Sequence, residues 1–168
     1  MSKSLIIAEK PSVANDLARA LGGLKKADEH FENERYIISS ALGHLVELAL
    51  PSELDVKRGK WSFANLPIIP DEFDLKPIDK KTSRQSPEQT LKKLLHLARR
   101  KDVTELINAC DAGREGELIF KNIIKYGKIN KPIRRLWLQS MTRESIREAF
   151  EHLRSNEQMI PLAQAAVA

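Results

Sequence analysis

The sequence contains a single cysteine, Cys110, among its 168 residues. One thiol cannot form an internal disulfide or supply the thiolates of a structural zinc site, so both kinds of cross-link are excluded. Long apolar runs are also lacking, because the short run near the N-terminus ends at Glu9 and Lys10. We therefore expect no signal peptide and no membrane span, and the lone thiol favours the reducing cytoplasm.

A large excess of one charge is lacking too. Lys and Arg total 28 against 23 Asp and Glu, which gives a net charge of +5 and a pI near 9.3. This mild excess is compatible with a polyanionic partner and equally with an ordinary soluble protein. Hydrophobic residues make up 42% of the chain, which is enough for the core of one compact domain.

Short apolar runs alternate with amphipathic segments along most of the chain. Strands are predicted at residues 5–8, at 36–40, in the run that ends at Asp111 and at 133–138, and helices start at Ser12 and Pro87, cover 118–124 and follow Thr142. This alternation predicts an α/β fold with a mostly parallel sheet and helices on both faces.

The pattern changes between residues 51 and 86. Four prolines and a set of basic residues interrupt the periodicity there: Pro51, Pro67, Pro70, Pro77, Lys57, Arg58, Lys60, Lys80, Lys81 and Arg84. A long irregular loop excursion is predicted, of the kind that is usually functional or mobile. Its basic residues suit either a nucleic-acid backbone or a solvated loop.

The segment from 108 to 120, NACDAGREGELIF, reads as a turn from a strand into a helix. Asp111 and Glu115 flank the permanent cation of Arg114, and Gly113 and Gly116 allow tight backbone geometry. Carboxylate oxygens suit Mg²⁺, and a guanidinium suits phosphate, so the segment indicates a site for a metal-bound phosphate. The alternative is an acidic loop with a helix-capping glutamate and a solvated arginine.

A second carboxylate segment follows the first predicted strand. If that strand lies beside the strand ending at Asp111, Glu9 and Asp111 emerge at the same edge of the sheet, with Glu115 within reach. Three converging carboxylates repel one another, and a divalent cation removes this penalty. Glu117 points to another side of its helix and is left out of the site.

Several segments occur together, in order and spacing, in one protein family. They are 7–12 (IAEKPS), 41–45 (ALGHL), 66–70 (LPIIP), 111–119 (DAGREGELI), 135–137 (RLW) and 140–142 (SMT). Together they resemble the type IA DNA topoisomerases, and most closely the bacterial topoisomerase III branch. The resemblance implies an N-terminal Toprim domain over residues 1–155, with a Rossmann-like sheet and a Mg²⁺ site.

The resemblance also implies residue roles. Glu9, Asp111 and Glu115 match the metal-binding acids, and Lys10 and Arg114 match the positions that hold the scissile phosphate of DNA. Glu9, Lys10, Arg114 and Glu115 are accordingly the expected catalytic residues.

The resemblance also bears on Trp61 and Gly113. Trp61 resembles a DNA-contacting position, where it could stack on single-stranded DNA, or else it anchors the irregular loop to the core. Gly113 stands where many family members have a second aspartate, so we expect one metal ion to be held rather than two. His44, in a Gly-His-Leu turn, either lies near DNA or is structural.

Type IA topoisomerases cleave one DNA strand with a tyrosine from a downstream domain. Tyr36 and Tyr126 lack the family's surroundings of that tyrosine, so no nucleophile is predicted in this chain. Residues 156–168 resemble the start of the next helical segment. We therefore expect a piece of a longer topoisomerase, which acts on single-stranded DNA together with downstream domains.

Other functions remain compatible with the sequence. A Toprim nuclease or primase-like enzyme would use the same acids, although primases add a zinc-binding module that one cysteine cannot form. A receiver-type module would need a lysine at a later strand end, where the chain has Leu138 and Gln139. A non-catalytic module that binds only Mg²⁺ or DNA is the remaining alternative.

Overall fold

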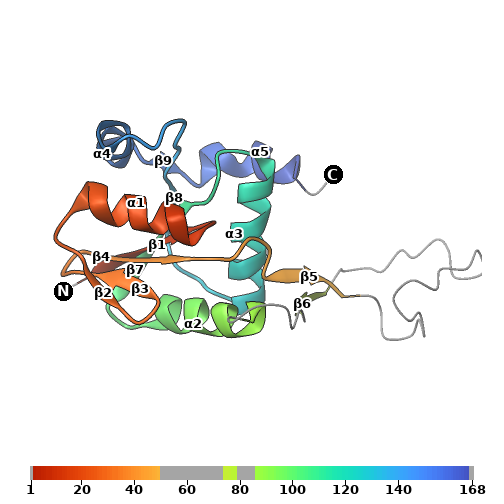
Figure 1. Cartoon of the computed structure of the whole chain (residues 1–168). Helices are drawn as coiled ribbons and strands as arrows, with labels where there is room; N and C mark the ends of the chain where they lie inside the picture. Colours follow the sequence, from red (N-terminus) through yellow and green to blue (C-terminus); the bar gives the residue numbers. More distant parts are fainter. Residues whose placement is uncertain (1, 50–73, 79–85, 167–168) are drawn as a thin grey trace, which may run out of the picture.

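The computed structural model describes residues 2–49, 74–78 and 86–166, and a seven-stranded sheet forms its centre, in the order β2-β3-β4-β1-β7-β8-β9 (Figure 1). The strands of this sheet are β1 (Lys3–Ala8), β2 (Lys25–Ala27), β3 (His30–Glu32), β4 (Tyr36–Ser40), β7 (Val103–Ala109), β8 (Ile133–Arg135) and β9 (Arg154–Ser155). The helices are α1 (Pro11–Leu21), α2 (Pro87–Arg99), α3 (Arg114–Gly127), α4 (Arg143–Glu151), the 3₁₀ helix η2 (Glu157–Met159) and α5 (Ile160–Gln164).

The four central strands β4, β1, β7 and β8 run parallel, whereas β2, β3 and β9 pair antiparallel at the two sides. The predicted α/β fold with a mostly parallel sheet is thus confirmed. None of the helices among the described residues is long and apolar enough to cross a membrane.

Helices cover both faces of the sheet, and the alternation of side chains along β1 explains why. Leu5 and Ile7 pack with α2 and α3, while Ile6 and Ala8 pack with α1 and α4 on the opposite face. In Figure 1 α1 and α4 lie on one side of the sheet and α2 on the other. Because both faces are buried, the strand sequence reads as a continuous apolar run.

The helix ends follow local sequence. Ser86 Oγ accepts a hydrogen bond from the Gln89 amide at the start of α2, and Thr142 Oγ1 accepts one from the Ser145 amide at the start of α4. The helix predicted to start at Ser12 begins one residue earlier, at Pro11, and its N-cap residue Lys10 makes no side-chain cap hydrogen bond. Proline suits the first helical position, where its missing N–H costs nothing.

Five of the described strands were not predicted, and one of them is β9, which pairs with β8 at the side of the sheet. The hairpin of β2 and β3 extends the sheet beyond β4, and β5 (Val46–Leu48) pairs with β6 (Leu75–Pro77) in a separate ribbon. β5 therefore follows the Gly-His-Leu turn directly, and β6 lies within the predicted excursion 51–86. Trp61 and the basic residues of that excursion lie outside the described residues.

A charged network links the start of β1, the end of β3 and the residues just before β7. The guanidinium of Arg100 binds both oxygens of the Glu32 carboxylate, at 3.0 and 2.7 Å, and also pairs with Asp102. Lys3 donates to Glu32 from the start of β1. The Arg100 hydrogen bonds in particular lower the pKa of Glu32 from 4.5 to about 2.

This network predicts an acid-sensitive contribution to stability. The folded-state pKa of Glu32 is depressed, so its contribution is complete above pH 4.5 and is lost as the pH falls toward 2. We expect Glu32→Gln to lower the free energy of unfolding by roughly 2–3 kcal/mol at pH 7 and by much less near pH 2.5, as measured by urea unfolding. Glu88→Gln is the control, because the exposed Glu88–Lys92 pair should contribute about 0.5 kcal/mol or less. An equal loss at both pH values for Glu32→Gln would contradict the assignment.

Candidate functional site

Two neighbouring central strands end at the same edge of the sheet. β1 and β7 are paired in parallel with Ala8 opposite Ala109, so Glu9 and Asp111 leave the sheet close together. The helices that follow β1 and β7 cover opposite faces, since α1 lies on one face and α3 on the other, and the two connections lead to opposite sides of the sheet. Such a change of face opens a crevice at the strand ends, which is where α/β sheets bind ligands. The structure thus brings together the two carboxylates that the sequence paired.

The two acids share one lysine. Glu9 is only 8% exposed, and its carboxylate accepts a hydrogen bond from the Asp111 amide at 3.3 Å. Lys10 Nζ lies 2.8 Å from Asp111 Oδ2 and 3.6 Å from Glu9 Oε1. The hydrogen bond to Asp111, followed by the charges of both acids, raises the pKa of Lys10. A cation between the carboxylates marks a place where positive charge is stabilised.

The first turn of α3 adds further charges to this edge. Arg114 and Glu115 are both exposed, and Glu115 Oε1 lies 3.3 Å from His44 Nε2. His44 is brought here by its loop, since the Gly43 amide bonds the Glu9 carbonyl and Gly43 has a φ of 75° that favours glycine. The sequence left the role of His44 open, and the Gly-His turn directly after β4 was the available signal for its position at the strand ends.

These residues surround an open hollow of about 690 Å³. Its lining residues are Glu9, His44, Asp111, Gly113, Arg114, Glu115, Gly116, Leu118, Ala165 and Ala166. Acidic groups, a guanidinium and an imidazole therefore face one space at a sheet edge. This combination suits an anionic ligand that arrives together with a cation.

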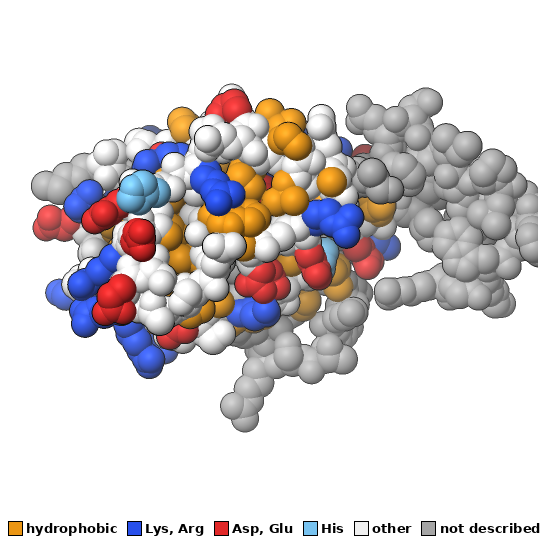
Figure 2. Space-filling view, turned by 90° about the horizontal axis from the view of Figure 1, so that it is seen from above, with side chains coloured by type: hydrophobic (Ala, Val, Ile, Leu, Met, Phe, Trp, Pro, Cys, Tyr) orange, Lys and Arg blue, Asp and Glu red, His pale blue; other side chains and the backbone are white. Residues whose placement is uncertain are grey.

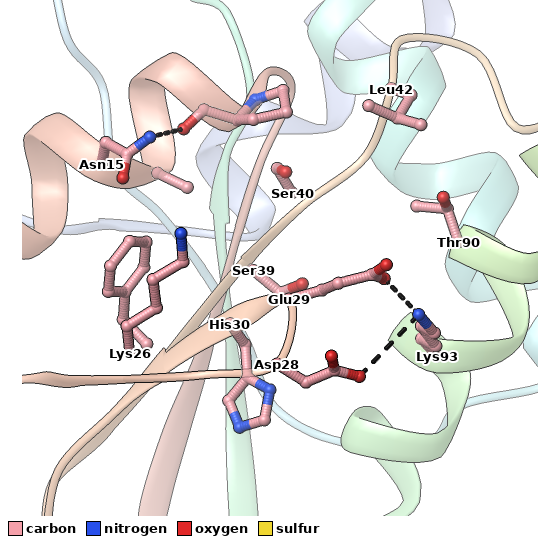
Figure 3. Close-up of a pocket in the computed structure, with 13 residues that line it drawn as sticks. Asn15, Lys26, Asp28, Glu29, His30, Ser39, Ser40, Leu42, Thr90 and Lys93 are labelled. Atoms are coloured by element: carbon pink, nitrogen blue, oxygen red, sulfur yellow. Dashed lines mark hydrogen bonds and ion pairs between the residues drawn. The ribbon is translucent and has the colours of Figure 1, made fainter. Parts of the chain in front are cut away.

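A second pocket, of about 200 Å³, lies between the β2–β3 hairpin, α1 and α2 (Figure 3). Lys93 reaches across it to Glu29 at 2.6 Å and to Asp28 at 4.0 Å, so the hairpin turn is fastened to α2. None of the predicted site residues lines this pocket. We therefore assign the candidate site to the hollow at the ends of β1 and β7.

The surface charge is mixed. Figure 2 looks down on the face that carries α1 and α4, and it shows acidic and basic side chains interspersed around an apolar centre. This agrees with the small net charge of +5. The described side chains on this face thus form no continuous basic surface, and Lys10 and Arg114 are individually placed cations near the hollow.

The carboxylates at the hollow are ligands of the kind that Mg²⁺ requires. No group of three or more His, Cys, Asp or Glu able to hold a metal occurs within residues 2–49, 74–78 and 86–166. Glu9 and Asp111 nevertheless fit Mg²⁺, because its protein sites commonly use one or two carboxylates and leave other positions to water and phosphate. Burial raises the pKa of the Cys110 thiol to about 12, so no thiolate competes. Glu9 and Asp111 offer oxygen donors, which favour Mg²⁺ over zinc, and the imidazole that lines the hollow, that of His44, pairs with Glu115.

One buried ion pair beneath the hollow was not predicted. Glu117 is excluded from the hollow, as expected, but it is buried at 2% exposure and pairs with Arg135 at 2.6 Å instead of acting at the helix surface. The adjacent arginines 134 and 135 were the available signal, because one of two consecutive strand residues must face a covering layer.

Other expected positions do not contribute to the hollow as the structure describes it. Trp61 lies outside the described residues. Tyr36 belongs to β4 and Tyr126 to the last turn of α3, and neither lines the hollow. The described part of the chain thus offers acids and cations at the site, and no tyrosine.

Known proteins resemble this chain along its whole length. A family model described as the Toprim domain matches residues 4–141. Over all 168 residues the chain is 47% identical to DNA topoisomerase 3 of Bacillus cereus (strain ATCC 14579) and 45% identical to DNA topoisomerase 3 of Bacillus subtilis (strain 168). Each match covers 100% of this chain and 22% of the relative, so the chain spans about a fifth of the length of these relatives.

The fold is also found among solved structures. Full-length topoisomerase I from Thermotoga maritima matches with a TM-score of 0.56 and 23% identity, over 92% of this chain and 21% of that one. At this identity the match shows the fold alone. The sequence resemblance to topoisomerase III is confirmed by the Bacillus relatives, and the family model covers most of the chain. The chain therefore belongs to the Toprim domain family.

Proposed function

We propose that this chain is the Mg²⁺- and phosphate-binding Toprim part of a type IA, topoisomerase III-like enzyme. Such an enzyme cleaves one DNA strand, passes DNA through the break and rejoins it. The observation that carries the proposal is the ammonium group of Lys10 lying between the Glu9 and Asp111 carboxylates at adjoining strand ends. The tyrosine that attacks DNA is proposed to lie outside these 168 residues, in the larger protein that the Bacillus relatives represent.

Each residue at the hollow has a proposed task. Glu9 and Asp111 hold Mg²⁺, and Glu115 completes the acidic set from the first turn of α3. Lys10 and Arg114 bind the non-bridging oxygens of the scissile phosphate, Lys10 by exchanging one of its carboxylate partners for the phosphate. Bound Mg²⁺ supplies a Lewis acid that neutralises charge on the phosphate.

The number of metal ions follows from the same donors. Gly113 contributes no carboxylate, and the Glu115 carboxylate pairs with the His44 imidazole. The described residues therefore place two acids together, Glu9 and Asp111, rather than three. We propose a single Mg²⁺ ion. His44 keeps Glu115 at the rim of the hollow until substrate binds.

The proposed partners follow from the chemistry of the substrate. The ligand is a single-stranded segment of DNA, which Trp61 contacts by stacking in addition to Lys10 and Arg114. Residues 1–155 form the Toprim domain, and residues 156–168 lead toward the downstream domains. We place the whole enzyme in the cytoplasm, where Cys110 stays reduced.

The test separates binding from catalysis. We expect the isolated chain to bind Mg²⁺ in a calorimetric titration and to leave supercoiled plasmid unrelaxed, whereas the complete protein that contains it relaxes the plasmid. Relaxation by the isolated chain would contradict the proposed division of the active site. Mg²⁺-dependent nicking by the isolated chain would instead support a Toprim nuclease.

A further inference from the structure

Arg135 is the largest fully buried side chain among the described residues, with 1% of its surface exposed. Its neighbour Arg134 points the other way and pairs with Glu105 at 2.7 Å in an exposed position. A buried guanidinium is costly unless hydrogen bonds and a counter-charge compensate for lost water. The groups that Arg135 contacts therefore indicate what its burial does for the structure.

The guanidinium holds the backbone that carries Asp111. Nη1 donates to the carbonyls of Asn108 at 3.0 Å and Cys110 at 2.7 Å, and also to that of Leu136 at 2.9 Å. Nη2 donates to the carbonyl of Asp111 itself at 2.8 Å. One rigid planar fork thus fixes three carbonyls across the point where β7 ends and the acidic loop begins.

Glu117 supplies the counter-charge from α3. Its Oε1 lies 2.6 Å from Arg135 Nε, although the geometry is not that of an aligned hydrogen bond, and it accepts a bond from Asn108 Nδ2 at 3.1 Å. Asn108 Oδ1 in turn accepts from the Cys110 amide at 3.0 Å. The Trp137 ring covers the guanidinium, with its centroid 5.2 Å from Cζ. Side chains from α3 and from β8 therefore both bind residues 108–111.

We propose that Arg135 is a positioning residue, which fixes the direction in which Asp111 leaves β7 and so holds the Asp111 carboxylate beside Glu9 and Lys10. Arg135 does not touch the ligand and acts only through the Asp111 backbone. The proposal deepens the proposed function, on which it rests for the role of Asp111 as a Mg²⁺ ligand. Stability alone is a poor account of the pair, because buried ion pairs can often be replaced by apolar residues without loss.

Two variants of the chain separate positioning from stability. Arg135→Lys keeps the charge opposite Glu117 but cannot bind several carbonyls in one plane. The double variant Arg135→Met with Glu117→Met removes the pair and keeps an apolar filling. Arg134→Lys is the matched control, since that side chain belongs to the same strand and pairs with Glu105 in an exposed position.

The measurements are urea unfolding, amide hydrogen exchange at Cys110 and Asp111 without metal, and Mg²⁺ titration. We expect the double variant to stay folded with a somewhat lower urea midpoint, because the carbonyls that Arg135 binds lose their donor, while exchange at Asp111 becomes about tenfold faster and Mg²⁺ affinity falls about tenfold or more. Arg135→Lys should show the same changes in exchange and affinity, and Arg134→Lys should show neither.

Unchanged exchange and affinity in a folded double variant would overturn the proposal and leave Arg135 as a charge partner of Glu117 only. If the double variant does not fold, Arg135→Lys decides by the same criteria. If the wild-type chain fails to bind Mg²⁺, the proposed function is contradicted. The exchange rate at Asp111 would then still decide whether Arg135 positions this loop.

Discussion

Replacing Gly116 with alanine is expected to lower the free energy of unfolding by about 3 kcal/mol. A Cβ at this position would lie 2.1 Å from the Asp111 carbonyl oxygen and 3.0 Å from the Asp111 carbonyl carbon. Those atoms belong to backbone that Arg135 holds in place, so they cannot move aside as a flexible side chain can. The gain of about 1 kcal/mol from alanine in a helix offsets only part of this clash. Urea unfolding of the isolated chain measures the difference.

Two other glycines provide controls for this prediction. At Gly113 a Cβ meets nothing within 4 Å and the backbone is extended with φ of 173°, so Gly113→Ala should be nearly neutral. At Gly127 a Cβ would approach the Leu95 Cδ2 atom at 2.3 Å, where a side-chain end can shift, so the loss should be intermediate. Gly116→Ala with wild-type stability would show that Asp111 is free to move, and would also weaken the positioning role of Arg135.

The main features of the site follow from sequence because they depend on strand ends. The apolar run before Glu9 and the one before Asp111 define parallel strands, and parallel strands present their carboxyl ends at one edge. Because β1 and β7 are parallel neighbours, the residues that follow them, Glu9 and Asp111, must lie close together. The position of Glu115 depends instead on a side-chain contact with His44, which the sequence pattern did not specify.

The parts that the sequence did not indicate have physical reasons. The hairpin strands Lys25–Ala27 and His30–Glu32 are short, the first exposed and the second only half-buried, so they show no alternation of apolar and polar residues. Arg135 carries a charge, and charged residues are almost never fully buried unless paired. Its partner Glu117 lies in another element, and the carbonyls that Arg135 binds have no sequence signature. Composition and periodicity report apolar faces and therefore miss buried polar networks.

Replacing Glu9 with glutamine in the complete protein is expected to reduce plasmid relaxation by about a hundredfold or more while the fold is retained. Glutamine has nearly the same shape, and its side-chain oxygen can still accept the hydrogen bond from the Asp111 amide. The change therefore removes a negative charge without removing the contact. Electrostatic stabilisation of the phosphate by a bound divalent cation is worth several kcal/mol, and a neutral ligand forfeits much of it. Gel-based relaxation assays over a range of Mg²⁺ concentrations measure the effect.

Glu148→Gln serves as the matched control, because Glu148 is an exposed acid of α4 away from the hollow and should leave relaxation unchanged. Higher Mg²⁺ should restore part of the Glu9→Gln activity, since a weakened metal site can be filled by mass action. Failure of added Mg²⁺ to help would mean that the Glu9 charge acts on Lys10 or on the phosphate directly. Normal relaxation by the Glu9→Gln protein at all Mg²⁺ concentrations would remove Glu9 from the site. Asp111 and Lys10 would then have to bind the phosphate without it, and the pairing of the two strand ends would have no catalytic role.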